Sequence, residues 1–118
     1  MTRWVVLTAV AACALGGCAS QLYGWGQYED SLYTRVTDAS AEGRQKAFGM
    51  LEQTIQRAEQ AGQRVPPGVY GDYGYLLYQS NRPDDAVRYF RKEAELYPEA
   101  KPLMDSVISR IDQKRTKP

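Results

Sequence analysis

The chain has 118 residues, of which 15 are Lys or Arg and 14 are Asp or Glu, and it contains no histidine. About a hundred residues remain once an N-terminal leader is removed, which suits one small domain and leaves no room for a second. The balanced charge excludes nucleic acid as a partner, since binding to phosphates needs a basic surplus or stripe.

Residues 1–17 have the features of a secretory signal peptide. Arg3 gives a basic start, and residues 4–15 form an almost unbroken apolar stretch that is followed by small residues. The stretch is too short to span a membrane, which takes about 20 residues. It also has no polar face, so it is not an amphipathic helix of a folded domain.

The end of the leader, Leu15-Gly16-Gly17-Cys18, resembles a bacterial lipobox, which predicts cleavage before Cys18 and lipidation of its thiol. Cys13 fits the same pattern loosely, but it would leave an apolar core below the minimum of about 7 residues. A disulfide is the alternative use of two cysteines, yet cleavage before Cys18 leaves one thiol in the mature chain.

The lipid places the protein at a membrane. The three acyl chains usual in Gram-negative bacteria exceed what stable attachment requires. Ala19 stands where an aspartate would be the usual signal for retention in the inner membrane, so we expect the periplasmic face of the outer membrane. Residues 18–26 are then a lipidated aromatic tether.

From residue 27 onward the apolar residues recur with a helical period, and no segment alternates like a strand. The sequence therefore predicts an all-α domain of about five helices over residues 27–112. Residues 38–40 connect the first two helices with capping side chains, and Gly62 closes the second as a left-handed cap. The apolar stripes of these helices are Tyr28, Leu32 and Val36, and then Phe48, Leu51, Ile55 and Ala58.

Prolines divide the rest of the domain. Residues 65–68 break the chain and start a third helix, with proline in its first turn, that runs to about Ser80. Pro83 begins a fourth helix, and Pro98 stops it. A fifth helix from about Lys101 acts as a cap, and residues 113–118 form a frayed tail. The inner side of the fifth helix is predicted to carry Leu103, Met104, Val107, Ile108 and Ile111.

The third and fourth helices match one tetratricopeptide (TPR) repeat over residues 67–100. Gly74 would let the third helix approach Ala86 on the fourth. Glu93 is the exception, because a small residue is expected at its position. The same repeat pattern does not match when it is shifted one repeat length toward the N-terminus. The positions that agree are Tyr70, Tyr73, Gly74, Leu77, Ala86, Phe90 and Pro98.

Three segments carry a family resemblance: YGWGQYEDSLY (23–33), RVPPGVYGDYGYLLYQSN (64–81) and FRKEAELYPEAKPLMDSVI (90–108). Together they resemble a family of small TPR-like bacterial lipoproteins known only as a domain of unknown function. The genes of this family often lie beside a CsgG-like lipoprotein. The resemblance therefore implies a role in envelope assembly or export.

The chain is poorly supplied for catalysis and for metal binding. It has no histidine, its mature cysteine would carry lipid, no serine has an evident base, and no run of carboxylates has EF-hand spacing. We therefore expect no enzymatic activity, no cofactor and no small-molecule substrate. The carboxylate pairs Glu93/Glu95 and Asp84/Asp85 are interpreted as a solvated face and as a helix start.

Tyrosines gather in residues 23–33 and 70–78. Helical spacing places Tyr28, Tyr70 and Tyr73 in the core. Tyr23 and Trp25 either lie at the membrane interface as an aromatic belt or fold back onto the helices, and the short tether favours the second.

The TPR resemblance implies a partner-binding groove lined by Gly68, Gly71, Tyr75, Tyr78 and Gln79, with the alternative that Tyr75 and Tyr78 only pack under the first helix pair. We expect a scaffold or assembly lipoprotein that binds a protein partner there. The CsgG-like lipoprotein is the candidate partner. A pilotin-like chaperone for an outer-membrane secretin or transporter subunit is the alternative, and a cell-wall enzyme is a third interpretation.

Overall fold

The computed structural model describes residues 21–117. The predicted signal peptide (residues 1–17) and Cys18 lie outside the described residues. The described part contains five α-helices and one short 3-10 turn, which confirms the all-α expectation. The elements are α2 (Tyr28–Thr37), α3 (Ala41–Gln60), α4 (Val69–Gln79), α5 (Pro83–Leu96), η1 (Pro98–Ala100) and α6 (Lys101–Thr116).

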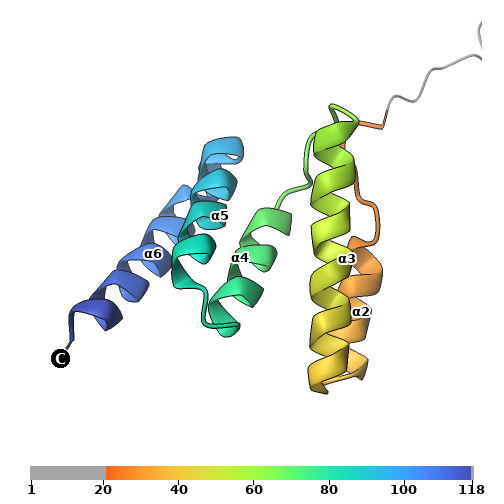
Figure 1. Cartoon of the computed structure of the whole chain (residues 1–118). Coiled ribbons are helices and arrows are strands. Elements are labelled where there is room, and N and C mark those ends of the chain that lie inside the picture. Colours follow the sequence, from red (N-terminus) through yellow and green to blue (C-terminus); the bar gives the residue numbers. More distant parts are fainter. Residues whose placement is uncertain (1–20, 118) are drawn as a thin grey trace, which may run out of the picture.

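Successive helices run antiparallel and lie side by side (Figure 1). The α2/α3 hairpin forms one end of the molecule, the α4/α5 hairpin the middle, and α6 packs against α5 at the other end. This order is consistent with the TPR-like arrangement that the sequence suggests.

Local signals set the helix boundaries. Ser40 caps α3 by accepting a hydrogen bond from the amide of Gly43, and Gly62 follows α3 with a φ of 65°, as expected. Proline was expected in the first turn of the third helix, but α4 begins only at Val69. The reason is Gly68, whose φ of 88° lies in the region that glycine favours, so the chain turns there before the helix starts.

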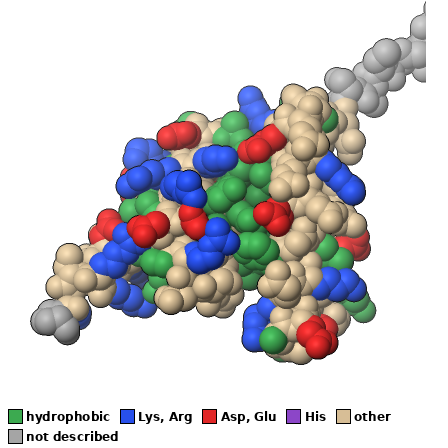
Figure 2. Space-filling view, viewed as in Figure 1, with side chains coloured by type: hydrophobic (Ala, Val, Ile, Leu, Met, Phe, Trp, Pro, Cys, Tyr) green, Lys and Arg blue, Asp and Glu red, His purple; other side chains and the backbone are tan. Residues whose placement is uncertain are grey.

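One hydrophobic core runs through α3, α4, α5 and α6. Helices α4 and α5 approach closely at Gly74, since a Cβ atom there would lie 2.9 Å from the ring of Phe90 and 3.1 Å from the carbonyl oxygen of Ala86. Hydrophobic side chains also gather over α4 on the face shown in Figure 2, flanked by interspersed acidic and basic side chains. The buried members include Leu51, Ile55, Ala58, Val69, Tyr70, Tyr73, Leu76, Leu77, Ala86, Val87, Phe90, Met104 and Ile111.

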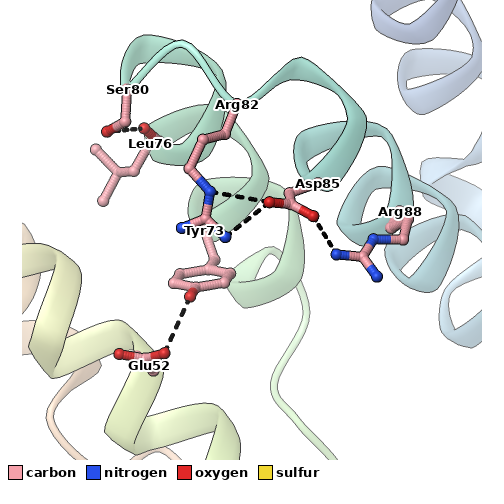
Figure 3. Close-up of polar contacts among 7 residues, drawn as sticks. All are labelled: Glu52, Tyr73, Leu76, Ser80, Arg82, Asp85 and Arg88. Carbon is pink, nitrogen blue, oxygen red and sulfur yellow. Dashed lines mark hydrogen bonds and ion pairs between the residues drawn. The ribbon is translucent and has the colours of Figure 1, made fainter.

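Polar contacts secure the α4–α5 turn and tie α4 to α3 (Figure 3). Hydrogen bonds from Arg82, at 2.9 Å, and from Arg88 hold the pKa of the Asp85 carboxyl below its usual range. The hydroxyl of Tyr73 donates to Glu52 on α3 at 3.4 Å, and burial raises the pKa of Tyr73 to about 12.

The buried side of α2 differs from the predicted stripe. Ser31 and Thr34 face the core, whereas Val36 is 85% exposed and Leu32 is only half-buried. The small side chains let α2 lie close to α3, and the hydroxyl of Thr34 reaches the sulfur of Met50. The apolar stripe of α2 is therefore turned toward the open face between α2 and α4.

The segment before α2 folds back along α3, as expected. The amide of Gly24 donates to the carbonyl oxygen of Arg64 at 3.1 Å, and the amide of Gln27 donates to Thr54 at 3.0 Å. A Cβ atom at Gly24 would lie only 2.8 Å from Ala58. The described part of the predicted tether thus belongs to the folded domain.

The predicted frayed tail from residue 113 is wrong for most of its length, because α6 continues to Thr116. Long-range contacts hold this last turn: Arg115 pairs with Asp84 at 2.9 Å, and Lys114 donates to the hydroxyl of Tyr78 at 3.2 Å. On the same helix, Leu103 was expected to face inward but is 63% exposed.

Candidate partner-binding groove

Three of the five predicted groove residues line one hollow. Gly68, Gly71 and Tyr75 border a cavity of about 550 Å³ between α4, α5 and α6. Tyr78 is half-buried against the core and contacts α6, so it does not line this cavity. Gln79 donates to the hydroxyl of Tyr75 at 3.1 Å and lines hollows on the side of α2 and α3.

The walls of this hollow, which we call the α4–α6 hollow, are mostly apolar. Phe90, Met104 and Val107 contribute to its lining, and the exposed Leu103 stands at its edge. A Cβ atom at Gly71 would lie 3.8 Å from Met104, so glycine here leaves space without being required by a clash. The volume of the α4–α6 hollow lies within the range of about 300–1,000 Å³ typical of binding pockets.

Glu93 lies in the wall of the α4–α6 hollow and is 2% exposed, so its placement on a solvated face was wrong. Its two carboxylate oxygens accept hydrogen bonds from the amides of Gly68 at 2.6 Å and Gly71 at 3.3 Å. The first turn of a helix presents unpaired amides and a positive dipole end, which explains why this carboxylate is buried beside α4. Its misfit to the TPR frame was the signal available in the sequence.

Tyr75 stands between two hollows and is 51% exposed. On its other side lies the α2–α4 hollow, about 430 Å³ in volume, whose apolar lining includes Leu32 and Val36. The two hollows adjoin at Tyr75, and we refer to the pair as the groove across α2, α4 and α6. The alternative that Tyr75 only packs under the first helix pair does not fit this exposure.

The two halves of the groove are joined by a polar cluster. Asp72 on α4 accepts hydrogen bonds from the hydroxyl of Tyr28 at 2.9 Å and from the guanidinium of Arg35 at 3.2 Å. Burial and the Asp72 carboxylate raise the pKa of Tyr28 to about 12. The ring of Trp25 packs against that of Tyr28 with centroids 5.9 Å apart and planes tilted by 36°, which connects the N-terminal segment to this cluster.

A larger hollow of about 820 Å³ lies elsewhere, between α5 and α6. Ala94, Pro98 and Ile108 supply its apolar surface, and charged side chains of both signs surround them. Sequence reasoning did not predict this surface. None of the predicted groove residues lines it.

Within residues 21–117, no group of three or more carboxylate, cysteine or histidine side chains is placed to hold a metal ion. No helix of that same range is long and apolar enough to cross a membrane.

Comparison with models of protein families gives a match over most of the chain. A family model described as "Domain of unknown function (DUF4810)" matches residues 22–107, which is most of the chain. Searches among curated proteins and among solved structures each gave no match. The matched range covers α2 to α5, η1 and the first part of α6 up to Val107, including every residue that lines the α4–α6 hollow. The chain therefore belongs to the DUF4810 family.

Proposed function

We propose that this protein is a lipid-anchored periplasmic lipoprotein of the outer membrane that binds a protein partner in the groove across α2, α4 and α6. The partner belongs to an envelope assembly or export system, with a CsgG-like lipoprotein as the first candidate. The observation that carries the proposal is the open, largely apolar α4–α6 hollow beside the half-exposed Tyr75. Exposed apolar surfaces of this kind typically mark interaction sites.

The proposed anchor also sets the orientation of the groove. Gln21 follows Cys18 by three positions along the chain, and a chain of that length reaches at most about 11 Å. Gly24 is held against Arg64, so the loop between α3 and α4 would lie near the lipid. Gly68, which follows that loop, lines the α4–α6 hollow, so a bound partner would be held close to the membrane.

Photo-crosslinking in cells tests the groove. A photoreactive amino acid is placed at Leu103, which is 63% exposed, and at Gln56 on the outer side of α3 as a matched control. We expect the Leu103 position to capture one membrane-associated protein and the Gln56 position to capture none. Mass spectrometry identifies the product.

Specificity is tested in the same experiment with Tyr75→Ala. Because Tyr75 is half-exposed, this variant should stay folded, as measured by circular dichroism, and should lose the Leu103 crosslink. A crosslink that persists in folded Tyr75→Ala would contradict the proposed groove. Mislocalisation of the captured protein in cells lacking this lipoprotein would identify the role as pilotin-like rather than as a scaffold.

A further inference from the structure

The two halves of the groove differ in charge. The α4–α6 hollow is lined by Asp72, Glu93 and Glu99, and no described Lys or Arg borders it. The α2–α4 hollow is lined by Arg35 and Arg44, and no described Asp or Glu borders that one. Tyr75 lines both hollows, so the charge changes sign from one side of this side chain to the other.

Some of these charges already have partners within the fold. Arg35 and Asp72 form an ion pair at 3.2 Å where the two hollows meet. Glu93 is satisfied by the amides at the start of α4, whose dipole offsets about half a unit of charge. The exposed charges left at the outer parts of the groove are Glu99 beside α6 and Arg44 beside α2.

One guanidinium nitrogen of Arg44 donates a hydrogen bond to the carbonyl oxygen of Ala39 at 2.6 Å. That contact fixes the side chain at the edge of the α2–α4 hollow. Glu99 lies in η1, directly before α6, at the edge of the α4–α6 hollow. An occupant that spans the groove therefore meets a negative charge at one end and a positive charge at the other.

We propose that the occupant is a peptide segment of a partner protein with large apolar side chains in its middle, a basic residue at the α6 end and an acidic residue at the α2 end. Complementary charges of this kind set the register and the direction of a bound segment. The inference rests on the proposed function, because it specifies the partner of the same groove.

The probes are four acetylated and amidated peptides that share a core of alternating leucine and alanine. Two carry lysines at one end and glutamates at the other, in both chain directions, and the remaining two carry lysines or glutamates at both ends. Binding to the full lipidated chain in nanodiscs is measured by fluorescence anisotropy. We expect one mixed peptide to bind several-fold more tightly than the lysine-only and glutamate-only peptides, with the difference reduced in 0.5 M salt, where the screening length falls to about 4 Å.

Charge-reversed variants assign the two ends. Glu99→Lys should weaken binding of the preferred mixed peptide by about fivefold, the upper range for an exposed ion pair, and should strengthen binding of the glutamate-only peptide. Arg44→Glu should likewise weaken binding of the preferred mixed peptide, and it should strengthen binding of the lysine-only peptide. Glu95→Lys on the far side of α5 and Lys46→Glu on α3 are the matched controls, and neither should change the affinity.

Three results would overturn the inference: equal affinity of all four peptides, dissociation constants weaker than about 1 mM for all of them, or no effect of either charge reversal. If the Leu103 crosslink survives while these results hold, the proposed function stands and only the chemistry of the partner is wrong. If the Leu103 crosslink and peptide binding are both lost, the groove is not a binding site. Self-association that Tyr75→Ala abolishes would assign the groove to a second copy of this chain and would likewise overturn the inference.

Discussion

Glu93 on α5 caps the first turn of α4, because its Oε1 atom lies 2.6 Å from the amide nitrogen of Gly68. The second carboxylate oxygen accepts from Gly71, so one buried side chain satisfies two amides that the helix itself leaves unpaired. This contact holds the wall of the α4–α6 hollow in place. It also fixes the position at which α4 begins after the left-handed Gly68.

Removal of this carboxylate should destabilise the domain. We expect Glu93→Ala to lower the free energy of unfolding by about 2–3 kcal/mol, since it leaves two buried amides without partners. Glu93→Gln keeps one acceptor and the same shape, so its loss should be smaller. Thermal unfolding followed by circular dichroism measures this, and for a domain of this size 1 kcal/mol corresponds to about 4–8 °C.

The control for this experiment is Glu95→Ala, two residues away on the same helix. Glu95 is exposed, and no hydrogen bond or ion pair with another described side chain ties it to a different helix, so its replacement should change the free energy of unfolding by less than about 0.5 kcal/mol. Equal melting temperatures of the Glu93 and Glu95 variants would contradict the capping role.

Gly74 gives a second prediction. A Cβ atom at this position would lie 2.9 Å from Phe90, so even Gly74→Ala should be strained, and Gly74→Leu should cost about 1–3 kcal/mol or more through overpacking. The helical signal of both variants should melt at a lower temperature than that of the wild type.

Gly49 on α3 is the matched control, because a Cβ atom there meets nothing within 4 Å. Gly49→Ala should raise the melting temperature, since alanine favours a helix over glycine by about 1 kcal/mol. A melting temperature of Gly74→Ala as high as that of Gly49→Ala would mean that α4 and α5 are not in close contact at Gly74.

The sequence predicts most of the fold because the signals are local. Pro83 and Gly62 set helix boundaries through their own backbone preferences, and the apolar stripe of α3 matches its buried side. The buried side of α2 could not be predicted in this way. Ser31 and Thr34 are buried because α2 lies close to α3, and hydropathy alone favours Leu32 and Val36 instead.

The groove could be predicted only in part for a similar reason. Helical spacing correctly places Gly71 and Tyr75 on one face of α4, four residues apart. Tyr78 is turned toward α6, where Lys114 contacts it, and no local pattern in the sequence indicates that α6 extends so far. Glu93 reaches the groove from another helix, so no pattern within α4 could reveal it.

Alkaline pH should destabilise the protein. Burial raises the pKa values of Tyr28, Tyr73 and Tyr97 from 10.0 to about 12. Between pH 10 and 12 the unfolded chain loses these protons while the folded chain keeps them. The folded state then binds more protons, so the free energy of unfolding falls as the pH rises through this window.

Thermal melting at intervals from pH 8 to 12 measures this effect, and the decline should begin near pH 10. Tyr97→Phe removes one of the titrating groups together with its hydrogen bond to the carbonyl oxygen of Val65. This variant should be less stable than the wild type at pH 8, but its further decline between pH 10 and 12 should be smaller. A decline identical to that of the wild type would show that Tyr97 does not contribute to the loss of stability at alkaline pH.

The anchor gives the last prediction. Because Leu15-Gly16-Gly17 precedes Cys18, Cys18→Ser should block lipidation and should leave the protein uncleaved or released from the outer membrane. Membrane fractionation and the mass of the N-terminal peptide measure the outcome. Cys13→Ser is the matched control and should fractionate like the wild type, since the apolar core before Cys13 is too short for a signal peptide. If Cys18→Ser keeps wild-type fractionation and Cys13→Ser loses it, the lipid is on Cys13, and five more residues would separate the domain from the membrane.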